Sequence, residues 1–239
     1  MESISKNKIK WVKSLSLKKN RQSERCFIIE GPKIIEEVIE NWPDLIELIC
    51  TSDNEYDFKN KVYYATPLQL KTMSSHKTAP TILAVVKFPE INPIKDGLTL
   101  AVDGIQDPGN MGTIIRTADW FGVNQIICSL NTVDIYNSKV IQSSMGSIFR
   151  MNIIYTDLVE FCRNTDKPTY GAQLDGEDMY RIDLDPKGIL IIGNEGNGIS
   201  PELAKHLKKT VLIPRIGEAE SLNAAVATAV LLAEFKRPI

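Results

Sequence analysis

The sequence ILIIGNEGNGIS (residues 189–200) carries the strongest indication of the architecture, because an apolar run leads directly into three glycines within six residues. A short apolar run without alternation is typical of a strand that is buried on both faces, as in a parallel sheet. The glycines predict a tight turn whose backbone groups face a ligand. Their order, G-x-x-G-x-G, differs from the dinucleotide fingerprint G-x-G-x-x-G, and no Walker-type phosphate loop occurs in the chain.

A second loop at a strand end lies in AVDGIQDPGNMGTIIRTADWFG, residues 101–122. An apolar strand ends at Val102, and a turn rich in glycine then leads into a helix. The unpaired N–H groups of a helix N-terminus give such a loop a positive potential. Asn110 and Arg116 are its candidate functional residues. A simpler interpretation stays open, in which Asn110 only caps the helix and Arg116 is a surface charge.

A third loop lies in VLIPRIGEAESLNAAVATAVLLAEF, residues 211–235, and precedes a strongly apolar helix. Serine is a favoured N-cap, so capping is the simplest role for Ser221. Asn223 is expected inside the first turn, where asparagine is a mediocre helix former, and this favours a functional role. In the glycine-rich loop, Glu195 is expected to project its carboxylate into the ligand cavity, although it could be an ordinary acidic turn residue.

Strands alternate with helices throughout residues 98–239, which predicts an α/β domain with a mostly parallel sheet covered on both faces. In such sheets the ligand binds beyond the carboxyl ends of the strands, where the three loops lie. The expected strands are 98–102, 124–128, 169–174, 188–192 and 210–213. The expected helices are 111–121, 157–164, 201–208 and 222–236.

Residues 1–90 are predicted to form a smaller α/β domain, joined to the larger one by a linker over residues 91–97. Expected strands are 26–29, 45–50, 62–65 and 81–88, and expected helices begin at Pro32 and Pro67. The strand at 81–88 is almost continuously apolar, which indicates burial on both faces.

The composition is that of an ordinary globular protein, with 239 residues, 43% of them hydrophobic and 24% charged. The longest apolar run, 224–233, is about half of the ~20 residues that cross a bilayer, so no membrane partner is expected. The first ten residues lack the apolar stretch of a signal peptide. The cysteines stand far apart and form no C-x-x-C pair: Cys26, Cys50, Cys128 and Cys162. With only His76 and His206 besides, a metal site is not expected, and a reduced cytoplasmic protein is the simplest reading.

The net charge of −2 hides an asymmetry between the N-terminal segment and the remainder. Residues 1–25 hold two acidic and eight basic residues: Lys6, Lys8, Lys10, Lys13, Lys18, Lys19, Arg21 and Arg25. A basic segment on an acidic body indicates a nucleic-acid partner. The alternative is an amphipathic helix whose charges are merely solvated.

The three loops, in this order, resemble the signature motifs of the SpoU (TrmH-type) RNA ribose 2′-O-methyltransferases of the SPOUT superfamily. N-x-G-x-I-x-R-x-A occurs at 110–118, G-N-E-G-x-G-x-S at 193–200, and I-P…S-L-N-x-x-V-A at 213–227. The resemblance covers residues 98–235. A fainter one, in FIIEGPKIIEEVIE at 27–40, is to the substrate-binding domain that precedes the methylase in many members.

The resemblance implies a mostly parallel sheet with a C-terminal trefoil knot, preceded by a small α/β substrate-binding domain. It also implies S-adenosylmethionine as cofactor, and a homodimer in which each site borrows residues from its partner. Five residues match the family's cofactor-binding positions: Gly193, Asn194, Gly196, Ile213 and Leu222. Five others fall on its catalytic positions: Asn110, Arg116, Glu195, Ser221 and Asn223.

The family account gives Arg116 the role of activating the ribose hydroxyl, but a guanidinium with a pKa above ~12 is a poor base. We therefore expect Arg116 to clamp the adjacent phosphate in bidentate fashion and to lower the pKa of the hydroxyl electrostatically. Ser221 would orient the guanidinium, and Glu195 would position its loop. Two residues depart from common family choices, Arg215 in place of Met and Gln142 in place of Arg, and both bear on RNA contacts.

The predicted function is therefore S-adenosylmethionine-dependent methylation of a ribose 2′-hydroxyl. Ribosomal RNA is favoured as the substrate, by analogy with members that carry an N-terminal domain. Two alternatives stay open: a transfer-RNA ribose methyltransferase, and an RNA-binding protein with a degenerate methylase domain. A nicotinamide-dependent oxidoreductase is disfavoured, because the glycine fingerprint is missing after the strand at 98–102.

Overall fold

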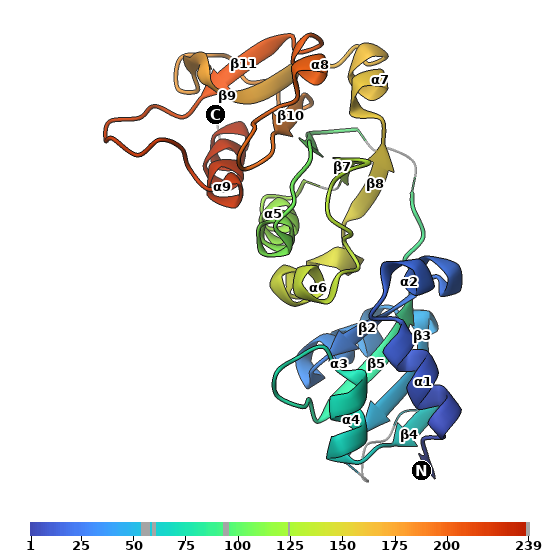
Figure 1. The fold of residues 1–239 in the computed structure, drawn as a ribbon. Coiled ribbons are helices and arrows are strands. Elements are labelled where there is room, and N and C mark those ends of the chain that lie inside the picture. The colour runs from blue at the N-terminus through green and yellow to red at the C-terminus, as the bar shows by residue number, and fades with distance from the viewer. Residues whose placement is uncertain (54–57, 59–60, 93–95, 124, 238–239) are drawn as a thin grey trace. The chain divides into compact units, whose positions relative to one another are not determined.

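The computed structural model describes residues 1–53, 58, 61–92, 96–123 and 125–237. Its contacts divide the chain into two compact units (Figure 1). The first unit comprises Met1–Glu90 and Tyr136–Gly146, and the second comprises Ile91–Ile135 and Ser147–Ile239. The segment Tyr136–Gly146, which lies inside the second predicted domain in sequence, is thus grouped with the first unit.

The second unit contains a six-stranded sheet in the order β11-β9-β10-β6-β7-β8, and every pairing in it is parallel. Its strands are β6 Thr99–Val102, β7 Gln125–Ser129, β8 Asn152–Thr156, β9 Thr169–Asp178, β10 Ile189–Ile192 and β11 Lys209–Leu212. The predicted mostly parallel sheet is confirmed. Strand β8 was missed because only three apolar residues mark it in the sequence. Asn124, expected to begin β7, lies outside the described residues.

Helices cover this sheet and bury its central strands. They are α5 Pro108–Trp120, α7 Leu158–Arg163, α8 Pro201–Ala204 and α9 Ala224–Phe235, with a 3-10 turn, η2, at Ser147–Phe149. Leu158, Cys162 and Leu203 of α7 and α8 pack on Ala101 and Ile191 of the sheet. Helix α8 ends at Ala204, four residues earlier than predicted. Within the described ranges, no helix has the length and apolarity that a membrane crossing requires.

The first unit contains a mixed five-stranded sheet in the order β1-β4-β3-β5-β2. The strands are β1 Glu2–Ser3, β2 Cys26–Glu30, β3 Ile46–Thr51, β4 Val62–Tyr64 and β5 Ile82–Lys87. The helices are α1 Lys6–Ser14, α2 Lys18–Glu24, α3 Pro32–Asn41, α4 Pro67–Met73 and α6 Ser138–Ser144, with a 3-10 turn, η1, at Pro43–Leu45. Strand β5 lies between β3 and β2 and is buried from Ile82 to Val86, which confirms the predicted burial on both faces.

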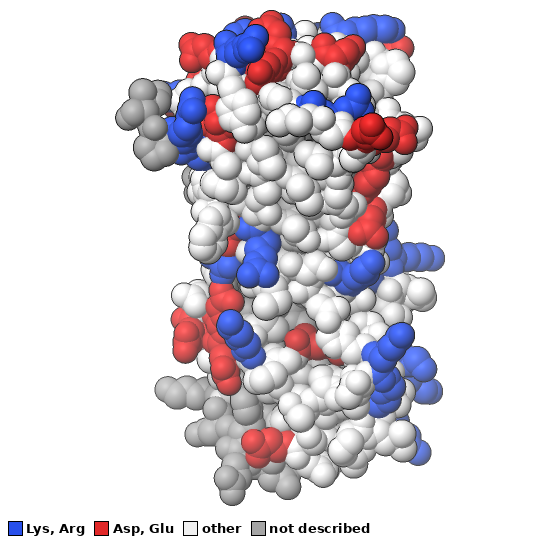
Figure 2. All heavy atoms as spheres, turned by 90° about the vertical axis from the view of Figure 1, so that its left-hand side faces the viewer, with Lys and Arg blue, Asp and Glu red and all other residues white. Residues whose placement is uncertain are grey.

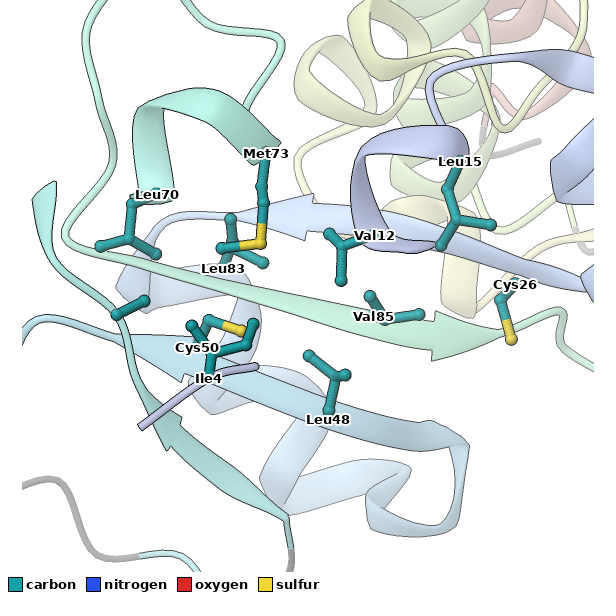
Figure 3. Packing of buried hydrophobic residues seen from close by; sticks show 11 residues of the cluster. Ile4, Val12, Leu15, Cys26, Leu48, Cys50, Leu70, Met73, Leu83 and Val85 are labelled. Atoms are coloured by element: carbon teal, nitrogen blue, oxygen red, sulfur yellow. The ribbon is translucent and has the colours of Figure 1, made fainter. Parts of the chain in front are cut away.

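The basic N-terminal segment is part of the core of this unit. Ile4, Val12 and Leu15 are buried in one cluster with residues of α4, β3 and β5 (Figure 3). Leu70 and Met73 of α4 lie in the same cluster. Helix α1 is therefore amphipathic and structural, so removal of residues 1–25 would unfold this unit and could not isolate the role of their charge.

The segment Tyr136–Gly146 completes the first unit. The Tyr136 ring stacks on Phe88, with centroids 3.8 Å apart, and also contacts Phe27 at 4.7 Å. Helix α6, which follows it, contacts β2 and was not predicted. Its polar sequence SKVIQSS offers only two apolar residues, Val140 and Ile141, and both are buried.

We expect Tyr136→Ala to destabilise the first unit by about 2 kcal/mol, because a half-buried ring that packs on two other rings is lost. The change in the free energy of unfolding is measured by chemical denaturation, in which the unfolding of the first unit is monitored. Tyr180→Ala is the matched control, since Tyr180 is 61% exposed, and its effect should be within about 0.5 kcal/mol. Equal effects of the two substitutions would contradict the structural role of Tyr136.

Candidate active site

The three strand-end loops meet at one hydrogen-bonded cluster of side chains. The Asn110 side chain donates from Nδ2 to Glu195 Oε1 at 3.0 Å. Its Oδ1 accepts a hydrogen bond from Asn223 Nδ2 at 2.8 Å. These partners lie 85 and 113 residues away from Asn110 in the sequence. The structure therefore brings together Asn110, Glu195 and Asn223, which the sequence analysis singled out from three separate segments.

Asn110 is available for this role because another residue caps its helix. Asp107 is the N-cap of α5, and its Oδ1 accepts from the backbone N–H of Asn110 at 2.8 Å. Pro108 follows at the first helical position, where a missing N–H costs nothing. The interpretation of Asn110 as a mere cap is wrong, and its side chain is left to join the other two loops.

The Glu195 carboxylate is anchored against the first loop. It accepts hydrogen bonds from the backbone N–H groups of Gln106 and Asp107, both at 3.3 Å, as well as from Asn110. Burial acts to raise the pKa of Glu195, but the hydrogen bonds from Asn110 and from backbone N–H groups outweigh it and lower the pKa below its ordinary value of 4.5. The first loop thus holds this carboxylate in place, and its projection into the ligand cavity stays a prediction.

The glycine-rich loop closes on itself. Asn194 and Gly198 exchange two backbone hydrogen bonds of 2.9 Å, and Asn194 Oδ1 accepts from the N–H groups of Gly196 and Asn197 at 3.0 Å. A Cβ on Gly193 would lie 2.2 Å from the backbone of Gly198, so only glycine fits there. The Asn194 side chain thus shapes the loop and leaves the backbone around Gly196 exposed.

The third loop places Asn223, and not Ser221, at the start of α9. Asn223 Oδ1 accepts from the backbone N–H groups of Ala225 at 2.9 Å and Val226 at 3.3 Å. The prediction that Ser221 caps this helix is wrong, because the chain is still irregular at Ser221 and α9 begins at Ala224. Asn223 therefore combines two tasks, since its oxygen caps the helix while its amide nitrogen reaches Asn110.

Ser221 and Arg116 stand apart from this cluster. Both side chains are exposed, and neither makes a hydrogen bond or an ion pair with any residue that the structure describes. Ser221 was expected to orient the Arg116 guanidinium. Within one chain, the structure shows no contact between these two described side chains. Arg116 lies on α5, six residues beyond Asn110, with its cationic group free to meet an anion.

The segment between β11 and α9 exposes backbone groups beside apolar side chains. From Ile213 to Leu222, no backbone N–H donates a hydrogen bond to a described residue. Ile213 is half-buried and Leu222 is 49% exposed. Such a surface, apolar with unpaired backbone N–H donors, suits a planar heterocycle that has a polar edge.

A fourth loop supports the site and was missed from the sequence. The N–H of Gly104 donates to Ser129 Oγ at 2.8 Å and Thr132 Oγ1 at 3.2 Å, while its carbonyl accepts from Asn194 Nδ2 at 2.7 Å. Gln106 Nε2 donates to the carbonyl of Asn131 at 2.5 Å. The polar residues that follow β7 were the available signal, because the carboxyl ends of parallel strands share one edge of a sheet.

The described residues offer neither an exposed cysteine nor a cluster of metal ligands. Burial raises the pKa of Cys26 to about 11 and that of Cys50 to about 12, so these thiols stay protonated at neutral pH. All four cysteines are free and buried. Among the described residues, no group of three or more His, Cys, Asp or Glu side chains is arranged to hold a metal ion.

Two family models match the chain, one over each part of the sequence. Residues 97–233 match the family described as SpoU rRNA Methylase, and residues 6–84 match the MRM3-like substrate binding domain. The chain is 31% identical, over 97% of its own length and 97% of the relative's, to the 23S rRNA (guanosine(2553)-2'-O)-methyltransferase RlmP of Bacillus subtilis.

Two solved structures are similar over nearly the whole chain. A putative RNA methyltransferase of the TrmH family from Porphyromonas gingivalis gives a TM-score of 0.88 at 35% identity, with 98% of each chain covered. An AdoMet bound rRNA methyltransferase from Sinorhizobium meliloti gives 0.87 at 28% identity, with 99% of this chain and 97% of that chain covered. A family match over more than half of the chain, joined to these likenesses, establishes that the chain belongs to the SpoU rRNA methylase family.

Proposed function

We propose that this protein transfers a methyl group from S-adenosylmethionine to a ribose 2′-hydroxyl of ribosomal RNA. The observation that carries the proposal is the Glu195–Asn110–Asn223 cluster, which joins the three loops that bear the family's motifs. The first unit would bind the RNA substrate, and the second would perform the transfer. The linker predicted at 91–97 would connect them, although its residues 93–95 lie outside the described chain.

Two loops would hold the cofactor. S-adenosylmethionine, when bound, supplies an electrophilic methyl group on a sulfonium. The exposed backbone at Gly196 and the unpaired backbone N–H groups between Ile213 and Leu222 would hold its adenosine part, with the side chains of Ile213 and Leu222 against the ring. Gly193 would contribute backbone contact. Asn194 would act indirectly, because its side chain is committed to the loop and to Gly104.

Arg116 is the residue that we assign to the RNA side of the reaction. Transfer is an in-line displacement, so holding O2′ ~3–3.5 Å from the methyl carbon supplies much of the rate enhancement. The exposed Arg116 guanidinium would grip the neighbouring phosphate through two parallel hydrogen bonds and stabilise negative charge as the hydroxyl loses its proton. Its lack of an ion-pair partner among the described residues leaves it free for this contact.

A homodimer through the second unit is part of the proposal. Exposed apolar side chains gather on α5, on α9 and on the loop before α9: Trp120, Ile216, Leu222 and Val226. On the face of this unit that Figure 2 shows, uncharged side chains form a broad area with charged residues at its border. Exposed apolar side chains on elements that contact one another, as α5 and α9 do, are typical of a protein interface. A partner subunit would also bring the residues that Arg116 and Ser221 lack within one chain.

We further propose that the C-terminal part of the chain is threaded as a trefoil knot. Strand β11 lies beyond β9, so the chain leaving β10 must pass β9 to reach it. The chain then returns, because α9 packs against α5, which follows β6 on the other side of β10. This pass and return support the knot that the family resemblance implies.

The same proposal places the protein in the cytoplasm. Its four cysteines are free and buried in the described structure, as expected for a reducing compartment. Ribosomal RNA, the proposed substrate, is also found there.

The direct test of the function is methyl transfer from radiolabelled S-adenosylmethionine to purified ribosomal RNA, with ribose methylation mapped in cells that have and lack the gene. We expect one 2′-O-methyl mark in ribosomal RNA to depend on the gene. If the methylation that depends on the gene is found in transfer RNA, the substrate is transfer RNA and not ribosomal RNA. A chain that binds RNA but shows no calorimetric binding of S-adenosylmethionine would be a binding protein with a degenerate site.

Arg116→Lys tests the bidentate clamp. A lysine keeps the charge but cannot supply two parallel hydrogen bonds, so we expect turnover to fall about 100-fold while S-adenosylmethionine affinity is unchanged. Single-turnover methylation and calorimetry measure the two quantities. Near-wild-type turnover of the lysine variant would rule out the clamp.

Asn223→Asp separates the two tasks of Asn223. Aspartate is as good an N-cap as asparagine, so the variant keeps the cap and should lose stability only through the missing hydrogen bond to Asn110. The variant lacks the amide that donates to Asn110, and we expect methyl transfer to fall at least about 10-fold. Asn223→Ala is the comparison, since it loses the cap as well and should cost about 1 kcal/mol of stability. Wild-type transfer by the aspartate variant would contradict the positioning role.

Glu195 makes the stability of the site dependent on pH. Because folding lowers the pKa of Glu195, its ionised carboxylate stabilises the protein above the ordinary pKa of 4.5, and this contribution is lost as the pH falls through the lower folded-state value. Denaturation of wild type and Glu195→Gln should therefore differ by a constant amount above about pH 5.5 and converge in more acidic buffer. A difference that is independent of pH down to about pH 3 would show that the carboxylate charge has no part.

A further inference from the structure

The structure divides the eight basic residues of the N-terminal segment into two groups with different tasks. Arg21 is buried, and its Nη1 donates to the carbonyls of Leu15 and Ser16 at 2.9 and 2.8 Å, which closes the turn between α1 and α2. Lys8 lies over the Tyr63 ring at 4.9 Å, and Arg25 lies over the Phe88 ring at 5.6 Å. These three cations are engaged in the fold of the first unit.

The other five are exposed lysines with no counter-charge: Lys6, Lys10, Lys13, Lys18 and Lys19. None of their ammonium groups makes an ion pair or a hydrogen bond with a residue that the structure describes. Helix α1 itself contains no acidic residue. The nearby Glu24 carboxylate accepts a hydrogen bond from Trp11 Nε1 at 3.2 Å.

Three of these lysines form a row. At 3.6 residues per turn, Lys6, Lys10 and Lys13 fall within an arc of about 60° and span about 10 Å along α1. The opposite face of the helix carries Val12 and, just beyond its end, Leu15, both buried in the core. The fold therefore fixes the lysine row toward solvent. In Figure 2, Lys and Arg side chains gather along one edge of the first unit.

We propose that this row, continued by Lys18 and Lys19 at the start of α2, is a docking surface for the RNA phosphate backbone. The inference rests on the proposed function, which supplies the class of partner. Uncompensated lysines at regular spacing suit a polyanion, and they contact phosphates as point charges without reading bases. A membrane surface fits less well, because a helix bound in that way buries an apolar face in lipid, and the apolar face of α1 is already packed in the core.

The test removes charge without disturbing the fold. The triple variant Lys6→Gln, Lys10→Gln, Lys13→Gln is compared with a control that removes three ion-paired lysines, Lys61→Gln, Lys187→Gln, Lys205→Gln. The control lysines are 60%, 67% and 63% exposed, and each has a carboxylate within 3.4 Å. The probe is a fluorescein-labelled RNA hairpin of arbitrary sequence, since phosphate contacts do not depend on sequence. Its affinity for the full-length protein is measured over a range of salt concentrations.

The slope of log affinity against log salt concentration is negative, and each phosphate contact contributes about 0.7 to 0.9 to its magnitude. We therefore expect the slope of the row variant to be smaller in magnitude than that of the wild type by about 2 to 3. The control variant should keep the wild-type slope. Both triple variants should unfold at the same temperature as the wild type, since all six substituted side chains are exposed to solvent. A row variant with the wild-type slope, or a control that reduces the magnitude of the slope equally, would overturn the proposal.

Two further measurements separate this proposal from its neighbours. Calorimetric binding of S-adenosylmethionine should be unchanged in the row variant, whereas a wild type that binds the hairpin but not S-adenosylmethionine would refute the proposed function and leave the docking surface standing. Vesicles containing phosphatidylserine should not bind the wild type. Vesicle binding that depends on the row, together with an unchanged RNA slope, would replace RNA by an anionic membrane as the partner.

Discussion

The amide of Asn110 is the constraint on which the site depends, because it joins three loops through one side chain. Its nitrogen meets the carboxylate of Glu195, and its oxygen meets the amide of Asn223. Each partner is in turn fixed to backbone, Glu195 by the N–H groups that open α5 and Asn223 by those that open α9. Two helix N-termini and one glycine-rich loop are thereby held in a single arrangement before any ligand binds.

This arrangement directs most of the motif residues to positioning. Asn110, Asn194 and Asn223 spend their hydrogen bonds on one another, on Glu195 and on backbone, so they build the surface that a cofactor would meet. Arg116 is the exception among the motif's charged groups, since it has no partner among the described residues. In the function that we propose, a site prepared in this way would need little rearrangement, since preorganised dipoles are an effective source of rate enhancement.

In the first unit, the N-terminal helices have both a buried face and a charged face. They contribute apolar residues to the core and lysines to the surface, so that core packing and the proposed RNA docking use opposite faces of α1. The segment Tyr136–Gly146, which comes from the middle of the chain, supplies a ring that stacks on Phe88. The first unit is therefore not contained in the first 90 residues, which has consequences for any attempt to express it alone.

Much of the architecture follows from local pattern. Residues 67–73 were predicted as a helix and form one, since Thr66 and Gln69 make a complete capping box and Pro67 stands in the first turn. Continuous apolar runs marked the central strands of the parallel sheet, because strands buried on both faces cannot alternate. Edge strand β8 and helix α6 escaped, because each has few apolar residues and gains its burial from neighbours that are distant in sequence.

By itself the sequence determined which residue types stand at the strand ends and that Gly193, Asn110, Glu195 and Asn223 match one family's motifs. Only the tertiary structure decided how these residues are used. In the folded chain, Asp107 and Asn223 cap the two helices and Ser221 caps neither. The Glu195 carboxylate bonds to the first loop. The tertiary structure also sorted the N-terminal cations into buried and exposed. The physical reason is that a hydrogen bond or a buried charge is defined by which atoms meet in space, and residues more than 80 positions apart meet only in the folded chain.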